Sequence, residues 1–258
     1  MKLLLHQTAK PSHYNKESES YDAFNEARSA VINSTIEKIL KKYNVNTVLD
    51  LTCGTGSQVF WLTEQGFTVV GSDINEKMLK IAKEKAKKEK LDLQFIKGDM
   101  RTIHVDEFDA VITIFNAIGH LTKTDFKKTL QNVHGNLKKD GLYIFDIANL
   151  NYFLKGDNIT DLTVDWLTTT DDTRFRDIQY STINIDGILA FYTTSIVQKG
   201  SEMPKVSKSA QTLQIYTAKQ LQEMLDKNGF KVLEQCGIDG SKFIEDRTDR
   251  ILTIAQKV

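Results

Sequence analysis

The chain has 258 residues, of which 40% are hydrophobic and 26% charged, and its formal net charge is zero. This length and balance predict one globular domain with its own core, with room for an insertion. Proteins that bind nucleic acids usually carry a basic excess, because contacts to phosphates supply much of their affinity. The neutral balance therefore argues against a nucleic-acid partner.

The two cysteines, Cys53 and Cys236, are too few for a disulfide framework or a zinc site built on cysteine. The opening MKLLLHQTAK holds a run of three apolar residues, far too short for the core of a signal peptide, and no later stretch approaches the length of a membrane span. The acidic residues lack the spacing of metal ligands. We therefore expect a cytoplasmic protein with neither a membrane partner nor a metal ion.

The first twenty residues are polar and are expected to lie over the surface, and apolar residues at helical spacing then predict a helix over 21–43. Strands and helices alternate after that helix. Strands are expected at 45–51, 67–73, 91–99, 108–115 and 141–148, and helices at 59–64, 74–89 and 125–137. This alternation predicts an α/β fold with a doubly wound, mostly parallel sheet and helices on both of its faces.

Helical periodicity vanishes over residues 151–216, where stretches rich in Thr, Ile and Tyr alternate. The dipeptide Asp186-Gly187 between two of them is a strong hairpin signal. We expect a small antiparallel β insertion of three or four strands that covers the substrate pocket.

The chain returns to a helix capped by Thr217 and ended by Gly229, followed by two strands that are expected to pair antiparallel at one sheet edge. The expected organisation is a lid segment and helix at 1–44, a ligand-binding domain formed by 45–150 and 217–258, and the insertion at 151–216.

The segment VLDLTCGTGSQ, residues 48–58, reads as a strand, a loop with Gly54 and Gly56, and the start of a helix. Glycines let the backbone approach a ligand closely, and a helix N-terminus favours a carboxylate or a phosphate. A dinucleotide fingerprint needs a third glycine at position 59, where Val59 stands. The loop therefore disfavours NAD.

Acidic residues follow the next two strands. Asp73 could accept hydrogen bonds from both hydroxyls of a ribose, or could simply cap the following helix. Asp99 could accept a hydrogen bond from an adenine amino group, with Met100 on the ring, or could belong to an ordinary turn. Because open α/β sheets bind ligands at the carboxyl ends of their strands, the coincidence favours a ribose-containing ligand.

These segments together resemble the class I S-adenosylmethionine-dependent methyltransferases. The matching stretches are VLDLTCGTG, VVGSDIN with Met78, KGDM, FDAVITIFNAIGH and NLKKDGLYIFDI. The phrase IFNAIGHL, the β-rich insertion and TLQIYTAKQLQEMLDKNGF particularly resemble amino-sugar N-methyltransferases of the desosamine type and small bacterial methyltransferases. The resemblance implies a Rossmann-like sheet of seven strands with an antiparallel last strand, and S-adenosyl-L-methionine as the cofactor, with S-adenosyl-L-homocysteine as its product.

The resemblance also implies roles for individual residues. The methionine part of the cofactor would lie on Asp50 and the loop that follows it, and the adenosine on the segments after the second and third strands. Phe115 and Asn116 would flank the sulfonium, and two N-terminal tyrosines would belong to a lid or, alternatively, would only pack. The candidate cofactor-binding residues are Tyr14, Tyr21, Asp50, Leu51, Thr52, Cys53, Gly54, Asp73, Ile74, Met78, Gly98, Asp99, Met100, Phe115 and Asn116.

His120 is the candidate catalytic residue. It follows the fourth strand, and its ordinary pKa of about 6.5 suits a general base that takes a proton from the acceptor. The alternative is a residue that caps the next helix or packs on the loop. His6, His13, His104 and His134 have no comparable placement and are expected at the surface.

The predicted function is methyl transfer to a nitrogen or oxygen of a small-molecule acceptor, by a monomer or a homodimer. The alternatives are a protein or nucleic-acid methyltransferase, a non-catalytic module that binds S-adenosylmethionine and, disfavoured by Val59, a dehydrogenase.

Overall fold

The computed structural model describes residues 5–15, 18, 21–155, 159, 162–169 and 171–258. The side chains of Tyr21 and of residues 23–28 lie outside this description. The described residues form two sheets, one of seven strands and one of four.

The larger sheet has the strand order β10-β11-β5-β4-β1-β2-β3. Its strands are β1 (Thr47–Asp50), β2 (Thr68–Asp73), β3 (Gln94–Lys97), β4 (Phe108–Thr113), β5 (Leu137–Ala148), β10 (Phe230–Gly237) and β11 (Arg250–Lys257). Strands β1 to β5 run parallel, whereas β11 is antiparallel to both of its neighbours. The expected fold class is confirmed, including the antiparallel last strand. Because the order reverses at β1, a crevice for a ligand is expected between the ends of β1 and β4.

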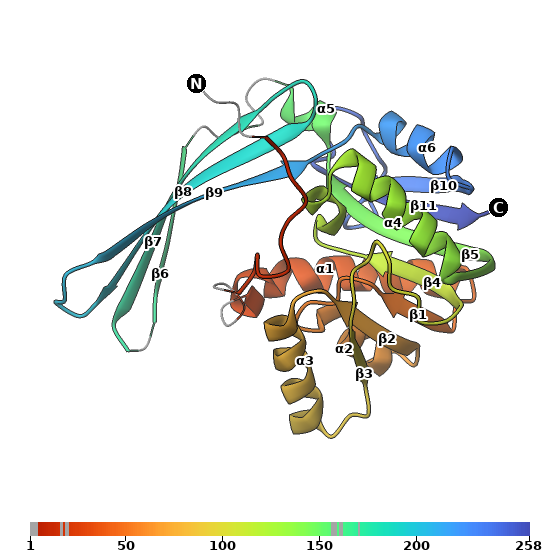
Figure 1. Cartoon of the computed structure of the whole chain (residues 1–258), viewed down its shortest axis with the longest axis horizontal. Helices are drawn as coiled ribbons and strands as arrows, with labels where there is room; N and C mark the ends of the chain where they lie inside the picture. The colour runs from red at the N-terminus through yellow and green to blue at the C-terminus, as the bar shows by residue number, and fades with distance from the viewer. Residues whose placement is uncertain (1–4, 16–17, 19–20, 156–158, 160–161, 170) are drawn as a thin grey trace.

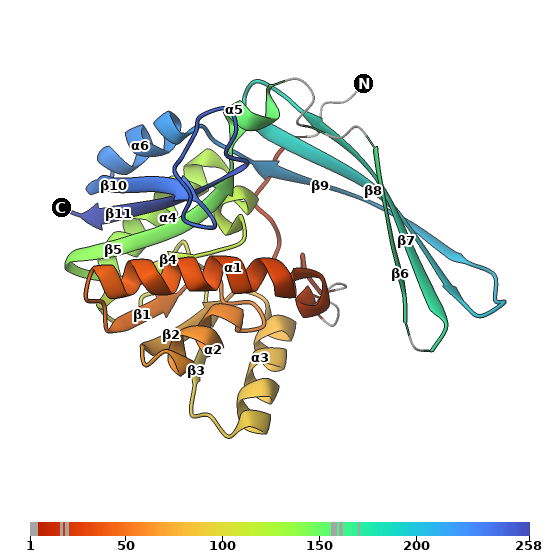
Figure 2. The same cartoon turned by 180° about the vertical axis from the view of Figure 1, so that it is seen from behind.

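Helices cover both faces of this sheet (Figures 1 and 2). The helices are α1 (Tyr21–Lys42), α2 (Ser57–Glu64), α3 (Glu76–Glu89), the 3-10 helix η1 (Ala117–His120), α4 (Lys123–Gly135), α5 (Leu150–Phe153) and α6 (Ala218–Asp226). Side chains of β5 alternate between two cores: Leu142 and Ile144 pack with α1, α2 and α3, whereas Tyr143 and Phe145 pack with α4 and α6. This two-sided burial explains why the strands read as nearly continuous apolar runs.

The cap of α3 shows whether the Asp73 carboxylate is needed to start the helix. Asn75 caps the helix, because its side chain accepts hydrogen bonds from the backbone N–H of Lys77 and of Met78, at 3.0 and 3.1 Å. Asp73, the other candidate cap, ends β2 three residues before α3 begins at Glu76. The helix therefore does not need the Asp73 carboxylate as its cap.

The smaller sheet, called the arm, holds β6 (Leu162–Thr168), β7 (Thr173–Ile183), β8 (Ile188–Lys199) and β9 (Lys205–Gln214). Neighbouring strands are antiparallel, as expected, and the arm projects from the rest of the chain (Figures 1 and 2). The predicted hairpin joins β7 to β8 through Gly187, whose φ is 82°. A Cβ there would lie 2.3 Å from the carbonyl oxygen of Ile215, so only glycine fits.

The N-terminal segment lies at the surface, as expected, because each of residues 5–15 is exposed or half-buried. These residues, called the strap, run between the arm and the seven-stranded sheet (Figure 1). The His6 Nδ1 atom lies 2.8 Å from the Thr212 Oγ1 atom on β9, and the Ala9 N–H donates to the carbonyl of His120 at 2.9 Å. Polarity predicted this exposure, and these polar groups also bond to other elements.

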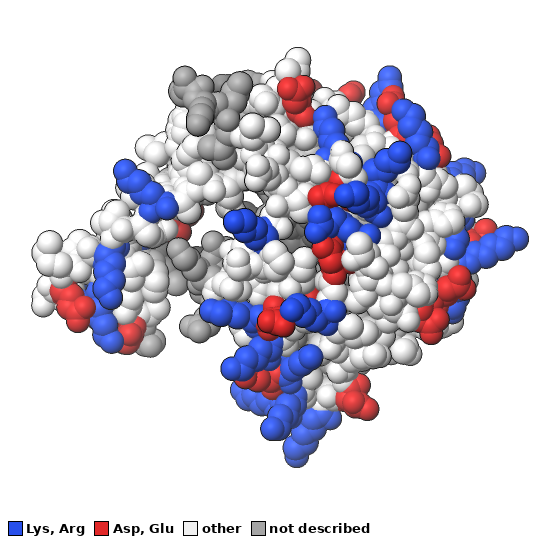
Figure 3. All heavy atoms as spheres, in the orientation of Figure 1, with Lys and Arg blue, Asp and Glu red and all other residues white. Residues whose placement is uncertain are grey.

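Charged side chains of both signs mix over the face drawn in Figure 3, and lysines gather over α3. Within the described residues, no helix combines the length and the apolar character that a membrane crossing needs.

Candidate functional site

A cleft with about 810 Å³ of empty space lies at the carboxyl ends of the parallel strands, closed on one side by the strap. Predicted site residues that line it are Tyr14, Leu51, Thr52, Gly54, Asp73, Ile74, Met78, Gly98, Asp99, Met100, Phe115 and His120. Three others, Asp50, Cys53 and Asn116, are not among the lining residues, and the side chain of Tyr21 falls outside the described part of the chain. The strap adds Thr8, Lys10 and Pro11, which the sequence analysis did not single out.

Asp73 is held by the backbone on both sides. The Gly54 N–H donates to its Oδ2 atom at 2.9 Å, and the Asn75 N–H donates to its Oδ1 atom at 2.7 Å. Burial raises the pKa of Asp73 above its ordinary value. Each carboxylate oxygen can accept a second hydrogen bond, so Asp73 keeps acceptor capacity toward the cleft.

Asp50 lies directly behind the glycine loop and is fully buried. Burial raises its pKa to about 8. Its Oδ1 atom accepts a hydrogen bond from the Thr52 N–H at 3.1 Å, whereas its Oδ2 atom has no hydrogen-bond partner among the described residues. An unpaired buried carboxyl oxygen is costly, so this atom marks a place where a positively charged or donor group would be stabilised.

Cys53 belongs to the core on the α1 side of the sheet rather than to the cleft. Burial and then the negative charge of Asp50 raise the pKa of its thiol. A thiol that stays protonated is a poor nucleophile, and this one is only 3% exposed. The small side chain instead packs where a larger residue would crowd Gly71.

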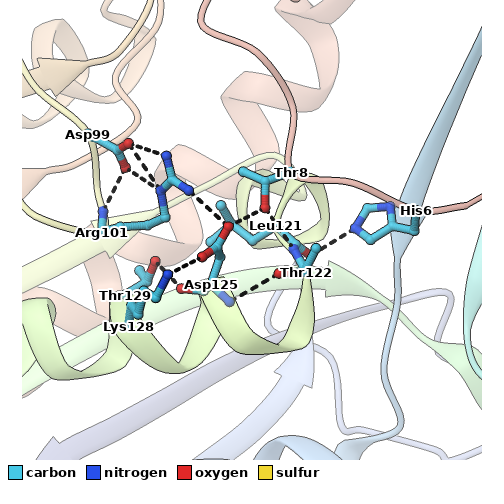
Figure 4. Close-up of polar contacts among 9 residues, drawn as sticks. All are labelled: His6, Thr8, Asp99, Arg101, Leu121, Thr122, Asp125, Lys128 and Thr129. Carbon is cyan, nitrogen blue, oxygen red and sulfur yellow. Dashed lines mark hydrogen bonds and ion pairs between the residues drawn. The ribbon is translucent and has the colours of Figure 1, made fainter.

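Asp99 is engaged by Arg101 (Figure 4). The guanidinium donates to both carboxylate oxygens of Asp99, with its Nη2 atom at 2.5 Å, and its Nη1 atom reaches Asp125 Oδ2 at 2.9 Å. Burial alone would raise the pKa of Asp99, but Arg101 outweighs it and holds this pKa below the ordinary value. Asp99 therefore faces the cleft as an anion tied to the start of α4.

Asp125 also anchors the strap. The Thr8 hydroxyl donates to Asp125 Oδ2 at 2.5 Å and accepts from the Thr122 N–H at 3.1 Å (Figure 4). The pKa of Asp125 is lowered to about 2, first by Thr8 and then by Lys128, and Arg101 adds to the effect. One network thus joins Asp99, α4 and the strap.

His120 and Tyr14 meet in the wall of the cleft, with the Tyr14 Oη atom 2.6 Å from the His120 Nε2 atom. Burial lowers the pKa of His120 to about 3, and the positive charges of His13 and His6 add to that shift. A neutral imidazole can accept the tyrosine proton through Nε2. The pair can hold, accept or pass on one proton.

The surface expectation is wrong for three of the other histidines. His6 bonds to the carbonyl of Leu121, His13 packs 5.0 Å from the His120 ring, and His134 packs 5.6 Å from the ring of Phe230. Only His104 is exposed as expected. Among the described residues, no group of three or more His, Cys, Asp or Glu side chains is arranged to hold a metal ion.

The turn after β4 is unusual. Phe115 and Asn116 have φ values of 65° and 57°, in the left-handed region that costs a non-glycine residue about 1–3 kcal/mol. Both N–H groups donate to Asp146, a buried acid of β5 that forms an ion pair with Arg250. Sequence reasoning missed this pair, although an acid within the apolar run LYIFDIA signals a buried partner.

Comparison with known proteins finds a family model that matches the central part of the chain. Residues 48–141 match the family model described as a methyltransferase domain. This matched segment, about a third of the chain, spans the glycine loop, Asp73, Asp99 and His120, so every strand end that forms the cleft lies within it.

Curated relatives of the chain include a protein of Geobacillus sp. (strain WCH70), named as a methyltransferase. It is 32% identical over 128 residues, which are 48% of this chain and 52% of that protein. The glycine/sarcosine N-methyltransferase of Parasynechococcus marenigrum is 36% identical over 123 residues, 46% of this chain and 44% of that protein. The chain thus spans about half the length of these curated relatives.

Solved structures share the fold over nearly the whole chain. An S-adenosylmethionine-dependent methyltransferase from Clostridium acetobutylicum ATCC 824 superposes with a TM-score of 0.78 and 21% identity, covering 95% of this chain and 98% of that one. The amino pentose methyltransferase CalS10 from Micromonospora echinaspora gives a TM-score of 0.73 at 16% identity, covering 93% and 97%. These likenesses confirm the class I methyltransferase fold, with the arm included.

Proposed function

We propose that the chain is an S-adenosylmethionine-dependent methyltransferase that transfers a methyl group to a small-molecule acceptor. The observation that carries the proposal is the placement of two acids, Asp73 and Asp99, at neighbouring strand ends of one cleft, beside the backbone of Gly54. A nucleoside can bridge two such acids with its sugar and its base, and the glycine loop leaves room for an amino-acid tail.

The residues present fit this cofactor. Ile74, Met78 and Met100 offer apolar and polarizable surface for an adenine ring. The unpaired Oδ2 atom of buried Asp50 suits a cofactor that carries positive charge at its amino-acid end. Asp73 is oriented by two backbone N–H groups and can still accept hydrogen bonds from ribose hydroxyls.

The bound cofactor supplies a methyl group activated on a sulfonium, so the protein has to bind, orient and exclude water. The strap lies over the cleft and its Thr8, Lys10 and Tyr14 contribute to the wall. His120 and Tyr14 share one proton position at the cleft, which suits them to take a proton from an acceptor. Because its pKa is lowered to about 3, His120 stays neutral at physiological pH, and its Nε2 atom can accept the hydrogen bond from Tyr14 that would relay a proton from the acceptor.

A nitrogen acceptor is favoured over an oxygen acceptor. Both glycine/sarcosine N-methyltransferase and an amino pentose methyltransferase are named for amine substrates. The glycine N-methyltransferase of Mus musculus is a third such relative, 27% identical over 189 residues that cover 62% of this chain and 64% of that protein. We propose a small amine as the acceptor and the cytoplasm as the location.

Calorimetric titration with S-adenosylmethionine, S-adenosylhomocysteine and NAD tests the cofactor. We expect the first two to bind and NAD not to bind. The Asp73→Ala variant should lose roughly tenfold to a hundredfold in affinity, because a charge-assisted hydrogen bond contributes about 1.5–3 kcal/mol. The exposed loop acid Asp92 supplies the control, since Asp92→Ala should bind as the wild type does.

A screen of small amines, glycine among them, then scores the release of S-adenosylhomocysteine. Turnover with an amine supports the enzyme, and binding without turnover on any acceptor class indicates a non-catalytic module. Tight binding of NAD without a response to the sulfonium cofactor would refute the proposal.

A further inference from the structure

Two residues outside the cleft control one of its walls. Phe115 lines the cleft, yet its backbone and that of Asn116 adopt left-handed φ values of 65° and 57°. Neither conformation is intrinsically favourable for a residue with a side chain, and least of all for a bulky one such as Phe115. The surroundings must therefore hold the turn in place.

Asp146 holds the turn. Its Oδ1 atom accepts a hydrogen bond from the Phe115 N–H at 2.6 Å, and its Oδ2 atom accepts from the Asn116 N–H at 3.2 Å. Successive N–H groups in such a turn form a concavity that binds an anion, and here the anion is a side chain of the same protein. The Asn116 side chain adds a second tie, because its Oδ1 atom accepts from the Ala148 N–H at 2.8 Å.

Arg250, the first residue of β11, compensates the buried charge. Its guanidinium pairs with Asp146, with the Nε atom 3.0 Å from Oδ2, and its side chain is only 13% exposed while that of Asp146 is fully buried. The same guanidinium lies over the Phe115 ring, 5.5 Å from its centroid. The wall of the cleft is therefore an aromatic ring backed by a neutralised ion pair.

The lining of the cleft brings the sulfur end of the proposed cofactor close to this wall. Phe115 lines the same cleft as Asp73 and Gly54, and β4 pairs directly with β1. If Asp73 of β2 holds the ribose and the glycine loop after β1 receives the amino-acid tail, the sulfur lies at the end of β1, about one strand spacing of 4.8 Å from the end of β4. Phe115 follows β4 directly. An aromatic face attracts a cation, and a second cation behind the ring opposes that attraction unless an anion cancels it.

We propose that Asp146 and Arg250 are positioning residues that set how strongly the cleft prefers the sulfonium cofactor over its uncharged product. Asp146 cancels the charge of Arg250 behind Phe115, and both residues hold the turn that presents the ring. This inference rests on the proposed function. It assigns a task to two residues of β5 and β11 that contact the cleft only through the turn.

Two single substitutions, one that removes the negative charge of Asp146 and one that removes the positive charge of Arg250, test the proposal. Dissociation constants for S-adenosylmethionine and S-adenosylhomocysteine are measured by calorimetry on the full chain, and their ratio is the readout. Asp146→Asn leaves the Arg250 charge uncancelled, so affinity for the sulfonium should fall about tenfold relative to that for the thioether. Arg250→Gln leaves the carboxylate uncancelled, so the same ratio should move in the opposite direction.

The double variant Asp146→Asn/Arg250→Gln has no net change in charge and should return the ratio to within about threefold of the wild type. Thermal melting verifies that each variant is folded, and the double variant supplies a folded case if a single one is not. Arg247→Gln, an exposed arginine of the same segment, serves as the control and should leave the ratio unchanged.

Shifts of opposite sign with restoration in the double variant support the proposal. A ratio that stays constant in all folded variants, or that moves in the same direction in both single variants, overturns it and leaves the proposed function standing. A wild-type chain that binds neither compound overturns both.

Discussion

The imidazole of His120 is built into the cleft in its neutral form. Because burial lowers its pKa to about 3, it should remain unprotonated throughout the pH range in which the protein is folded and active. His120→Gln should lower turnover by roughly 10²–10⁴ while leaving affinity for S-adenosylhomocysteine within about threefold, as loss of a general base does. Initial rates and calorimetry on the same preparations check both parts.

The dependence of kcat/KM on pH distinguishes a His120 with a lowered pKa from a histidine with an ordinary pKa. The wild-type kcat/KM should show no histidine inflection between pH 6 and pH 7. An inflection there that disappears in His120→Gln would contradict the lowered pKa. Equal turnover in the two proteins would remove His120 from the chemistry.

Asp50 predicts a stability effect with a defined sign. Its pKa in the folded chain is raised to about 8, from an ordinary value near 3.8, so the folded state holds a proton that the unfolded state releases. Stability due to this group is therefore full below about pH 4 and is lost as pH rises toward 8. Asp50→Asn cannot ionise and should melt higher than the wild type at pH 8.5.

The expected difference at pH 8.5 is at least about 1 kcal/mol, which corresponds to roughly 2–4 °C in the melting temperature of a chain of this size. At pH 4 the two ligand-free proteins should melt together. Asp92→Asn, at an exposed loop position, controls for general effects of charge. A wild-type advantage at pH 8.5 would refute the raised pKa.

At the level of residues, the sequence predicted the side chains that come directly after the strands of the sheet. It did not predict the side chains that reach the site from distant parts of the chain. Asp73, Met100 and His120 stand at fixed offsets from strand ends, so the periodic pattern carries their position. Arg250 reaches Asp146 across 104 residues and Thr8 reaches Asp125 across 117. Such contacts depend on how elements pack, which no local pattern encodes.

The strap is held over the cleft by a few polar contacts, and these predict its effect on ligand release. Thr8→Val removes the hydrogen bond to Asp125, a charged acceptor, so S-adenosylhomocysteine should dissociate about tenfold faster. Stopped-flow displacement measures this rate. Gln7→Ala, at an exposed strap position, should release the ligand at the wild-type rate. Equal rates in all three proteins would mean that the strap does not restrain the ligand.

Helices and strands were predictable wherever the apolar residues followed either the helical or the strand spacing clearly. The alternation along 45–148 specified the parallel sheet, and the Thr217 cap specified α6 through a capping box with Gln220. The strand expected from residue 141 instead begins at Leu137, and its pairing with β4 resumes at Leu142 after an irregularity in which Asp140 takes a φ of 62°. The short helix α5 and the packing of the strap against β9 left no periodic signal.

On the scale of the molecule, one face of the arm carries an exposed apolar surface. Strand pairing places Leu162, Tyr180 and Tyr192 side by side, and Val164 beside Ile178 on the same face. Trp166 continues this row and is 72% exposed. Three strands at a spacing of about 4.8 Å and five residues at a rise of about 3.4 Å make the face roughly 250 Å² before side-chain relief is counted. The largest apolar patch on a soluble protein is often functional.

We expect a second copy of the chain to cover this face. Trp and Tyr are enriched in protein interfaces. The apolar face of one sheet packs well on the apolar face of another, and in a two-fold homodimer the second copy presents the same face. Light scattering after size exclusion should give twice the mass of one chain for the wild type and for Asp165→Ser, whose exposed side chain lies on the opposite face of β6. Trp166→Asp should give the mass of one chain. A wild type that elutes as a single chain would rule this dimer out.

The strap that roofs the cleft has a kinetic consequence. Because His6, Thr8 and Ala9 each bond to the body of the molecule or to the arm, an exchange of spent for fresh cofactor on the side of the strap would require those bonds to break and form again. Throughput would then be limited by the residence time of the product, so bursts of product on first mixing should exceed the steady rate. A strap that keeps water away from the reacting atoms would also slow the release of the spent cofactor, so we expect the spent cofactor to inhibit strongly.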